Sequence, residues 1–249
     1  MKVIIVIPAR MHSTRLPQKP LIDLLGTSMI MRVYHQAMKV KNAHDVIVAT
    51  DHDDIYNHVN AQGGHVIMTS NHHATGTDRV AEVAKTTEGD FFINIQGDEP
   101  LINPLQIEDL IGDMNRYDAN IATQCTKITD QVTLFNENTV KVVRDNSNKA
   151  LYFSRQAIPA VRNLSYGKWF QSATYYRHIG IYGFKKNALL AVASLPLGKL
   201  EECEKLEQLR WMENGHMIHC FETQYSTIGI DTQEDISLVV DQILKNEFS

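Results

Sequence analysis

The sequence predicts an α/β protein with a mostly parallel, Rossmann-like sheet and helices on both faces. In its first half, short apolar runs alternate with longer stretches that have helical spacing. The apolar runs are continuous, as is typical of strands buried on both faces of a parallel sheet. The chain has 249 residues, which suits one large α/β domain, and no linker interrupts it. We therefore predict a single domain over residues 1–249.

The first half contains four strand–helix pairs. The apolar run at 3–7 predicts a strand, and apolar residues at helical spacing over 29–38 predict the helix that follows. Gly63 and Gly64 form a turn before the third strand, and Pro104 suits the first position of the fourth helix. The other predicted strands are 45–49, 65–68 and 91–95, and the other helices are 53–61, 78–85 and 104–116.

The second half has a different character. Its apolar runs are linked by polar, irregular sequence, which indicates antiparallel additions to the sheet or a small projecting subdomain. The predicted strands are 140–143, 150–153, 179–184 and 217–221, and the predicted helices are 186–193, 200–213 and 232–245.

Composition excludes several classes of protein. The formal net charge is −5, so the chain lacks the basic character of a nucleic-acid-binding protein. No apolar run is long enough to cross a bilayer, and the apolar start is too short for a signal peptide. Cys125, Cys203 and Cys220 show no CxxC spacing, so we predict three buried structural thiols in a reducing compartment. Together these observations predict a cytoplasmic protein without nucleic-acid or membrane partners.

The loop after the first strand concentrates positive charge. Arg10, Arg15 and Lys19 follow the apolar run closely, and Ser13 and Thr14 add hydroxyl groups. Ligands of open α/β sheets bind beyond the carboxyl ends of the strands, and a triphosphate rewards guanidinium and ammonium groups together. The loop has neither the GxxxxGK[ST] nor the GxGxxG pattern. A polyphosphate site is favoured over a merely solvated basic loop.

Two acidic segments could complete such a site. NIQGDEP (94–100) follows the fourth strand, where Gly97 allows close backbone approach and Asp98 could bind Mg²⁺, although Gly-Asp is also common in turns. In IGIDTQEDI (228–236), Asp231 could be a second metal ligand, or Asp231 or Thr232 could cap the last helix.

Three weaker signals remain open. The small-residue turn ATGTDRV (74–80), which includes Thr77, could meet a nucleotide or simply cap a helix. His178 lies in an apolar strand, where a lone histidine is usually structural, but the neighbouring Arg177 suits an anionic substrate. Glu204 and Glu207 are spaced as on a solvated helix face.

Together these segments resemble the bacterial 3-deoxy-manno-octulosonate cytidylyltransferases. The resemblance covers essentially the whole chain and depends on nine segments in order: IPARMHSTRLPQKPL, VIVATD, GTDRV, NIQGDEP, VKVV, ALYFSR-x-x-IP, RHIGIYGF, LEQLR and IDTQEDI. It implies a nucleotidyltransferase sheet with a small antiparallel dimerisation subdomain, a homodimer, and a Mg²⁺-dependent reaction. In that reaction CTP and the eight-carbon sugar acid give CMP-sugar and pyrophosphate for lipopolysaccharide synthesis.

The resemblance also implies roles for individual residues. It places Arg10, Arg15 and Lys19 on the phosphates, with Arg15, Lys19 and Asp98 as the catalytic residues, and puts Asp98 and Asp231 on Mg²⁺. For the nucleotide it implies Ala9, Arg10, Ser13, Thr77 and Gln96, and for the sugar acid Arg155, His178, Tyr182, Glu207 and Gln208.

Two departures from the family pattern leave questions open. Gln18 stands where the family loop commonly has glycine, which affects loop mobility or phosphate contact. LPLGKLEECEKLEQLR resembles relatives that accept the 8-amino sugar. The alternatives are therefore the same chemistry on that sugar or on another nonulosonate, a sugar-1-phosphate nucleotidyltransferase, a metal-dependent glycosyltransferase, and a nucleotide-binding regulator without turnover.

Overall fold

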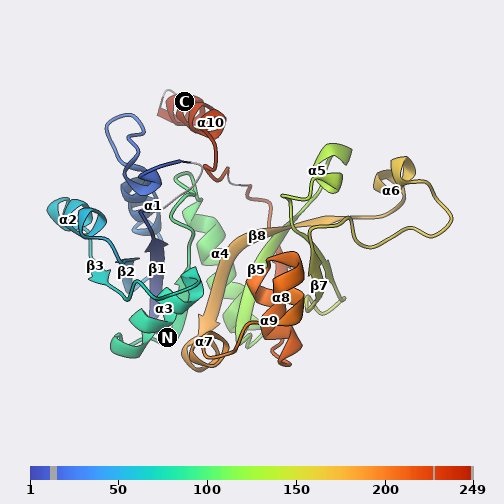
Figure 1. Cartoon of the computed structure of the whole chain (residues 1–249), viewed down its shortest axis with the longest axis horizontal. Helices are drawn as coiled ribbons and strands as arrows, with labels where there is room; N and C mark the ends of the chain where they lie inside the picture. The colour runs from blue at the N-terminus through green and yellow to red at the C-terminus, as the bar shows by residue number, and fades with distance from the viewer. Residues whose placement is uncertain (12–15, 227, 248–249) are drawn as a thin grey trace.

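A nine-stranded mixed sheet forms the centre of the molecule in the computed structural model, which describes residues 1–11, 16–226 and 228–247 (Figure 1). The strand order is β3-β2-β1-β4-β8-β5-β9, and β6 and β7 form a hairpin that joins β8. The strands are β1 Val3–Ala9, β2 Asp45–Thr50, β3 Val66–Met68, β4 Phe91–Asn94, β5 Ile121–Lys127, β6 Lys141–Arg144, β7 Ala150–Ser154, β8 Tyr176–Lys185 and β9 His219–Glu222.

Strands β1 to β4 form the parallel half of the sheet, as the sequence predicts. In β1 the register runs from Ile4 opposite Asp45 of β2, and Val3 lies opposite Phe91 of β4. Alternate residues of β1 enter the two core layers, Ile5 and Ile7 one and Ile4 the other. The carboxyl ends of β1 and β4 consequently meet at one edge of the sheet.

The second half adds antiparallel pairing, which confirms the other part of the predicted fold. β8 runs antiparallel to both β4 and β5, while β9 is parallel to β5. The sequence pattern does not predict β5, because Thr123 and Gln124 look out of place in a central strand. Both are buried, and their polar groups are paired: Thr123 Oγ1 lies 2.7 Å from Ile181 O, and Gln124 Nε2 donates to Gln106 O.

Helices cover both faces of the sheet. Buried residues of α1, α2 and α4 join one core layer, and those of α3, α7 and α9 join the other. The helices are η1 Lys19–Leu21, α1 Met29–Ala37, α2 Asp53–Ala61, α3 Gly76–Thr86, α4 Pro104–Arg116, α5 Gln131–Phe135, α6 Tyr166–Ser172, α7 Lys186–Ala193, α8 Lys199–Glu204, α9 Glu207–Glu213 and α10 Gln233–Glu247. In the described ranges no helix has the length and apolarity that crossing a bilayer requires.

The helix predicted over 200–213 is two helices. Lys205 takes a φ of 54°, in the left-handed region, and this ends α8 before α9 begins. The interpretation of Glu204 and Glu207 as a solvated face is wrong, because both carboxylates accept hydrogen bonds from other elements. Cys203 on α8 is exposed, against the prediction of a buried thiol, whereas Cys125 and Cys220 are buried.

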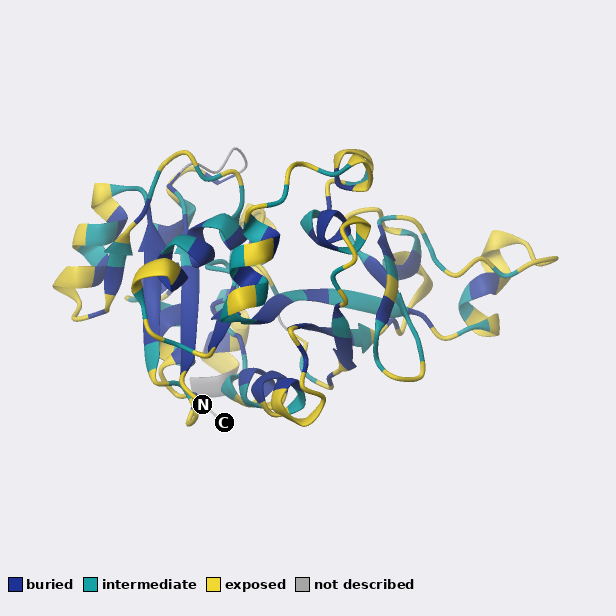
Figure 2. Cartoon of the chain, turned by 90° about the horizontal axis from the view of Figure 1, so that it is seen from below, coloured by how far each residue is buried: buried dark blue, intermediate teal, exposed yellow. Residues whose placement is uncertain are grey.

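A part of the second half projects away from the sheet. It carries α5 and α6, which lie near the start of β8 in Figure 1, and Figure 2 shows much exposed surface at its far end. A small core around Ile128, Leu134, Trp169 and Tyr175 holds it together, and the exposed ring of Tyr166 stacks on Trp169 with centroids 4.5 Å apart. The predicted small subdomain therefore has a core of its own.

Candidate functional site

A cavity of about 460 Å³ opens at the carboxyl edge of the parallel strands. The ends of β1 and β4 and the start of α3 line it, as expected for a ligand site in an open α/β sheet. Seven residues that the sequence singles out line it: Ala9, Arg10, Lys19, Gln96, Gly97, Asp98 and, from the segment before α10, Asp231. Segments far apart in sequence therefore meet at the predicted place.

Lys19 lies between two carboxylates in this cavity. Its Nζ is 2.7 Å from Asp98 Oδ2 and 3.1 Å from Asp231 Oδ1. Burial alone would lower the pKa of Lys19, but the charges and hydrogen bonds of Asp98 and Asp231 outweigh it and raise that pKa. The ammonium group therefore stays charged and holds both carboxylates at one point.

Backbone contacts explain why Asp231 reaches the site. The N–H of Ile230 donates to Asp98 O at 2.9 Å, which ties the segment before α10 to the loop after β4. Thr232, not Asp231, caps α10, because Thr232 Oγ1 accepts from the N–H of Asp235 while the Asp235 carboxylate accepts from the N–H of Thr232. Asp231, just outside this capping box, faces Lys19 with its side chain.

Two further features suit an anionic ligand. Nη2 of Arg10 is buried and has no hydrogen-bond partner among the described residues, although it belongs to a cavity-lining guanidinium. Gly97, also in the lining, packs closely against β1, because a Cβ there would lie 3.0 Å from Pro8 O; the close approach to a ligand stays a prediction. An unpaired buried guanidinium nitrogen is costly, so a ligand oxygen at this place would stabilise it.

Two predicted residues of the opening loop, Ser13 and Arg15, lie outside the described residues. Gln18, which stands where the family resemblance leads us to expect glycine, has a φ of 55° and a ψ of 28°. This left-handed conformation costs a residue with a Cβ about 1 kcal/mol, which is why glycine is common at such positions.

The turn before α3 serves the fold and the cavity together. Thr75 caps α3 in a capping box with Asp78, and Thr75 and Gly76 line the cavity. Thr77, predicted at the nucleotide, is buried, and its hydroxyl donates to Glu207 Oε2 at 2.9 Å. The other oxygen of Glu207 accepts from Thr75 Oγ1 at 2.8 Å.

Glu207 thus connects α9 to the first turn of α3. Arg210 donates to the same carboxylate at 2.9 Å. Burial raises the pKa of Glu207, and the two threonine hydroxyls and Arg210 oppose that shift. The carboxylate therefore fixes a wall of the cavity.

We expect Glu207→Ala to lower the free energy of unfolding by about 2 kcal/mol, because it leaves two threonine hydroxyls and Arg210 without their shared acceptor. Thermal unfolding of the ligand-free protein measures this loss. Glu202→Ala, at an exposed position on α8, is the matched control and should unfold like the parent. Equal melting temperatures for all three proteins would contradict the structural role of Glu207.

A second cavity, also of about 460 Å³, adjoins the first and shares Asp98 and Asp231 with it. Strand β8 contributes Arg177 and His178 to its lining, and the segment 138–140 faces them. The His178 ring lies against Phe153 and Tyr182, with centroids 5.0 and 5.4 Å away, and its Nε2 shares a hydrogen bond of 2.9 Å with Thr123 Oγ1. Burial lowers the pKa of His178 to about 3, so the ring is neutral at pH 7.

This shift predicts that the folded protein loses stability as the pH falls from about 6.5 towards 3. In that range the unfolded chain protonates His178 and the folded chain does not, at up to about 1.4 kcal/mol per pH unit. His178→Asn should flatten the dependence of the unfolding free energy on pH, measured by denaturant titration between pH 4 and 7. His72→Asn, at an exposed site, should leave the slope unchanged. An unaltered slope in His178→Asn would refute the assignment.

Four of the residues predicted to bind the sugar acid line neither cavity: Arg155, Tyr182, Glu207 and Gln208. Tyr182 and Gln208 are buried. The guanidinium group of Arg155 donates to the carbonyl oxygens of Glu204, Glu137 and Lys205. Arg155 therefore ties the end of β7 to the end of α8.

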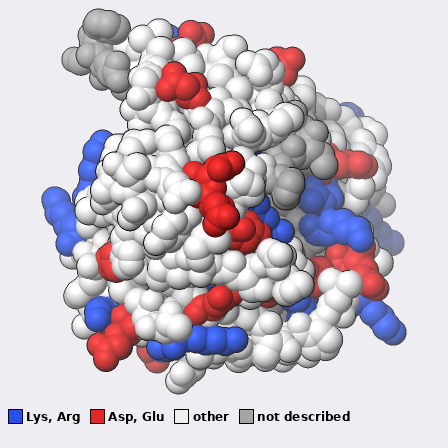
Figure 3. Space-filling view, turned by 60° about the vertical axis from the view of Figure 1, so that its left-hand side comes forward, with Lys and Arg blue, Asp and Glu red and all other residues white. Residues whose placement is uncertain are grey.

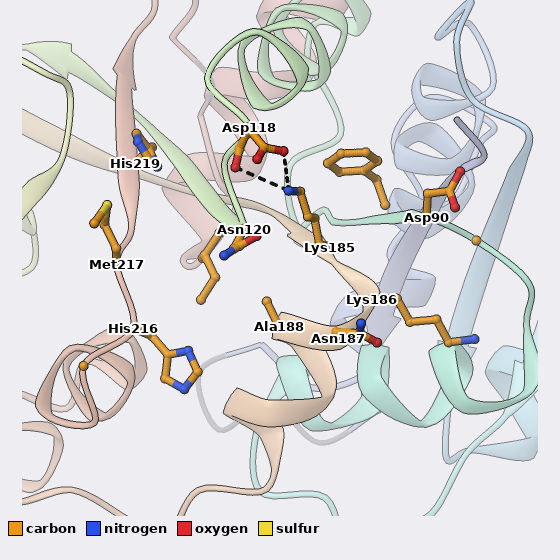
Figure 4. A pocket seen from close by; sticks show the side chains of 14 residues that line it. Asp90, Asp118, Asn120, Lys185, Lys186, Asn187, Ala188, His216, Met217 and His219 are labelled. Carbon is orange, nitrogen blue, oxygen red and sulfur yellow. Dashed lines mark hydrogen bonds and ion pairs between the residues drawn. The ribbon is translucent and has the colours of Figure 1, made fainter.

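A larger cavity, of about 870 Å³, lies at the opposite end of the sheet. It is lined by the starts of β4 and β5 and the first turn of α7, and none of the predicted site residues borders it. Figure 4 shows that Lys185 turns towards Asp118, with which it forms an ion pair of 2.5 Å. Because the predicted residues line only the two smaller cavities, we take those two as the candidate functional site.

The positive charge of the candidate site is concentrated in the first cavity. On the face shown in Figure 3, basic and acidic side chains are interspersed and form no single basic surface. The positive charge that matters is local: Arg10 and Lys19 project into a cavity that also holds two carboxylates. Such a cavity defines a class, the α/β proteins that bind a phosphate-bearing ligand at the carboxyl edge of a parallel sheet.

Comparisons with known proteins identify the family. A family model described as cytidylyltransferase matches residues 4–236, and the chain belongs to this family. The chain is 47% identical to the 3-deoxy-manno-octulosonate cytidylyltransferase of Parabacteroides distasonis, covering 95% of this chain and 96% of that protein. It is 45% identical to the enzyme of the same name from Fusobacterium nucleatum, covering 99% and 98%.

Solved structures agree with this assignment. CMP:2-keto-3-deoxy-manno-octonic acid synthetase complexed with CTP superimposes with a TM-score of 0.92 at 41% identity, covering 99% of this chain and 100% of that one. The 4-diphosphocytidyl-2C-methyl-D-erythritol synthase of Anaerococcus prevotii shares the fold alone, with a TM-score of 0.63 at 15% identity, covering 98% and 99%.

Proposed function

We propose that this protein transfers the cytidylyl group of CTP to 3-deoxy-manno-octulosonate, releasing pyrophosphate and supplying the activated sugar for lipopolysaccharide synthesis. The observation that carries the proposal is the meeting of Arg10, Lys19, Asp98 and Asp231 in one cavity of a chain that belongs to the cytidylyltransferase family. The relatives that it matches over almost their whole length bear this activity in their names.

Asp98 and Asp231 fit a Mg²⁺ site. Two carboxylates from separate segments already converge on one cation, Lys19 Nζ, and Mg²⁺ in proteins usually takes one or two carboxylates with phosphate oxygens. Bound there, Mg²⁺ would polarise the α-phosphate and lower the pKa of the attacking anomeric hydroxyl. No group of three or more possible protein ligands occurs among the described residues, so water and phosphate oxygens would complete the coordination of a metal on these two carboxylates.

The remaining residues position the reactants. Arg10 has a buried donor to offer a phosphate oxygen, and Lys19 would offset charge growing on the leaving pyrophosphate. Gln96 lines the same cavity, where its Nε2 donates to Gly180 O at 3.3 Å, beside the place for the nucleotide. The second cavity, which shares Asp98 and Asp231, offers a place for the sugar acid next to the α-phosphate. We assign no side chain as general base.

Pyrophosphate release tests the proposal. The purified protein is supplied with Mg²⁺, with CTP, UTP or dTTP, and with the 8-hydroxy sugar acid, its 8-amino analogue or a nonulosonate. Pyrophosphate that appears only with CTP and an octulosonate supports the proposal, and the ratio of the two octulosonate rates decides the preferred sugar. Sugar transfer without free pyrophosphate would indicate a glycosyltransferase, and CTP binding without turnover would indicate a regulator.

We also propose that the protein works as a cytoplasmic homodimer. The projecting part that carries α5 and α6 exposes Val132 and Tyr166, with relative accessibilities of 81% and 63%. Apolar side chains on a projecting element are typical of a subunit contact. Sedimentation equilibrium of the wild type should give twice the mass of one chain. The double variant Val132→Lys, Tyr166→Lys should give the mass of a single chain.

A further inference from the structure

Charge complementarity in the second cavity carries a further inference, which rests on the proposed function. The cavity is bordered by the carboxylates of Asp98, Glu99 and Asp231. A sugar acid that enters it carries a carboxylate of its own and lies next to a triphosphate. The site therefore needs a cation that is aimed at the sugar.

Arg177 is the one arginine or lysine among the described residues that line this cavity. It lies on β8, opposite Lys141 of β6 and Thr126 of β5, so sheet pairing on both sides fixes its backbone. Within the described ranges, its guanidinium makes one hydrogen bond, from Nη2 to Ser226 Oγ at 3.0 Å. The other donors of the planar fork remain for a ligand.

The competing cations are already engaged. Lys19 is held by Asp98 and Asp231, and the guanidinium of Arg155 donates to three backbone carbonyls without reaching either cavity. His178, next to Arg177, carries no charge at neutral pH because burial lowers its pKa to about 3.

We propose that Arg177 binds the carboxylate of the sugar acid and thereby selects acids over neutral sugars. A guanidinium matches a carboxylate with two parallel hydrogen bonds, which a lysine cannot reproduce. Arg177 would also orient the sugar, because it approaches from β8 while Asp98 and Asp231 lie on the side shared with the nucleotide cavity.

The test compares wild type, Arg177→Ala and Arg177→Lys on the sugar acid and on its C1 amide, with pyrophosphate release as the readout. Arg177→Ala should raise the KM for the sugar acid roughly 30- to 100-fold, the loss expected for a hydrogen bond between charged groups, while the KM for CTP changes less than about threefold. Arg177→Lys should give an intermediate KM. On the neutral amide, wild type and Arg177→Ala should perform alike, because no carboxylate is present.

Controls separate this inference from the proposed function. Arg116→Ala removes an exposed arginine of α4 and should leave both KM values unchanged. A normal sugar KM in Arg177→Ala, or equal rises for sugar and CTP, would overturn the inference while the function stands. A wild type that releases no pyrophosphate with any octulosonate overturns the function and the inference with it. Should Arg177→Ala fail to fold, Arg177→Lys decides on the same criteria.

Discussion

Asp98→Asn should reduce turnover roughly 1,000-fold or more while leaving the fold intact. The substitution keeps the shape of the side chain but removes one of the two negative charges that face Lys19 and would hold Mg²⁺. Metal coordination is worth several kcal/mol of transition-state stabilisation, and each 1.4 kcal/mol is about a factor of ten in rate. Pyrophosphate release at saturating CTP and sugar measures the effect.

A matched substitution elsewhere shows whether the effect depends on the position of the lost carboxylate. Asp118→Asn removes a carboxylate whose side chain is 92% exposed, at the opposite end of the sheet, and should leave turnover unchanged. The two variants should have similar circular dichroism spectra and melting temperatures. Turnover of Asp98→Asn within tenfold of wild type would refute the assignment of Asp98 to the metal.

Lys19→Met should lower kcat about 100- to 1,000-fold, because the ammonium group would no longer offset charge on the leaving pyrophosphate. The same variant should bind Mn²⁺ more tightly than wild type when no nucleotide is present. Lys19 Nζ contacts both carboxylates, and its removal takes away a cation that competes with a divalent metal for them. Mn²⁺ binding is followed by electron paramagnetic resonance, and turnover by pyrophosphate release.

Lys39→Met, at an exposed position just after α1, is the control for both measurements and should behave as wild type. Weaker Mn²⁺ binding by Lys19→Met would show that the lysine supports the metal site instead of competing for it. A kcat within threefold of wild type would remove Lys19 from the catalytic step.

The sequence predicted the parallel half of the fold well, because continuous apolar strands leave few alternatives. It also predicted the meeting of Arg10, Lys19, Asp98 and Asp231, since all follow strand ends or lie in segments that the family resemblance marks. These features depend on local patterns and on a general rule about where α/β proteins bind ligands.

Features that depend on tertiary partners could not be predicted in this way. Strand β5 was missed because Thr123 and Gln124 find partners that only the folded chain supplies. Glu207 looked solvated because its threonine donors are about 130 residues away in sequence. Arg155 was expected to bind the sugar acid, but backbone carbonyls that only folding brings to it occupy its donors; its predicted role stays untested.

The lysine between the two carboxylates has a consequence for the first encounter with the nucleotide. Without Lys19, Asp98 and Asp231 would present two negative charges to an incoming triphosphate, and long-range repulsion would slow association. With the ammonium group between them, the trio carries one net negative charge. The resting protein thus supplies a counter-ion from its own chain and lowers the electrostatic barrier at the mouth of the cavity before any divalent cation arrives.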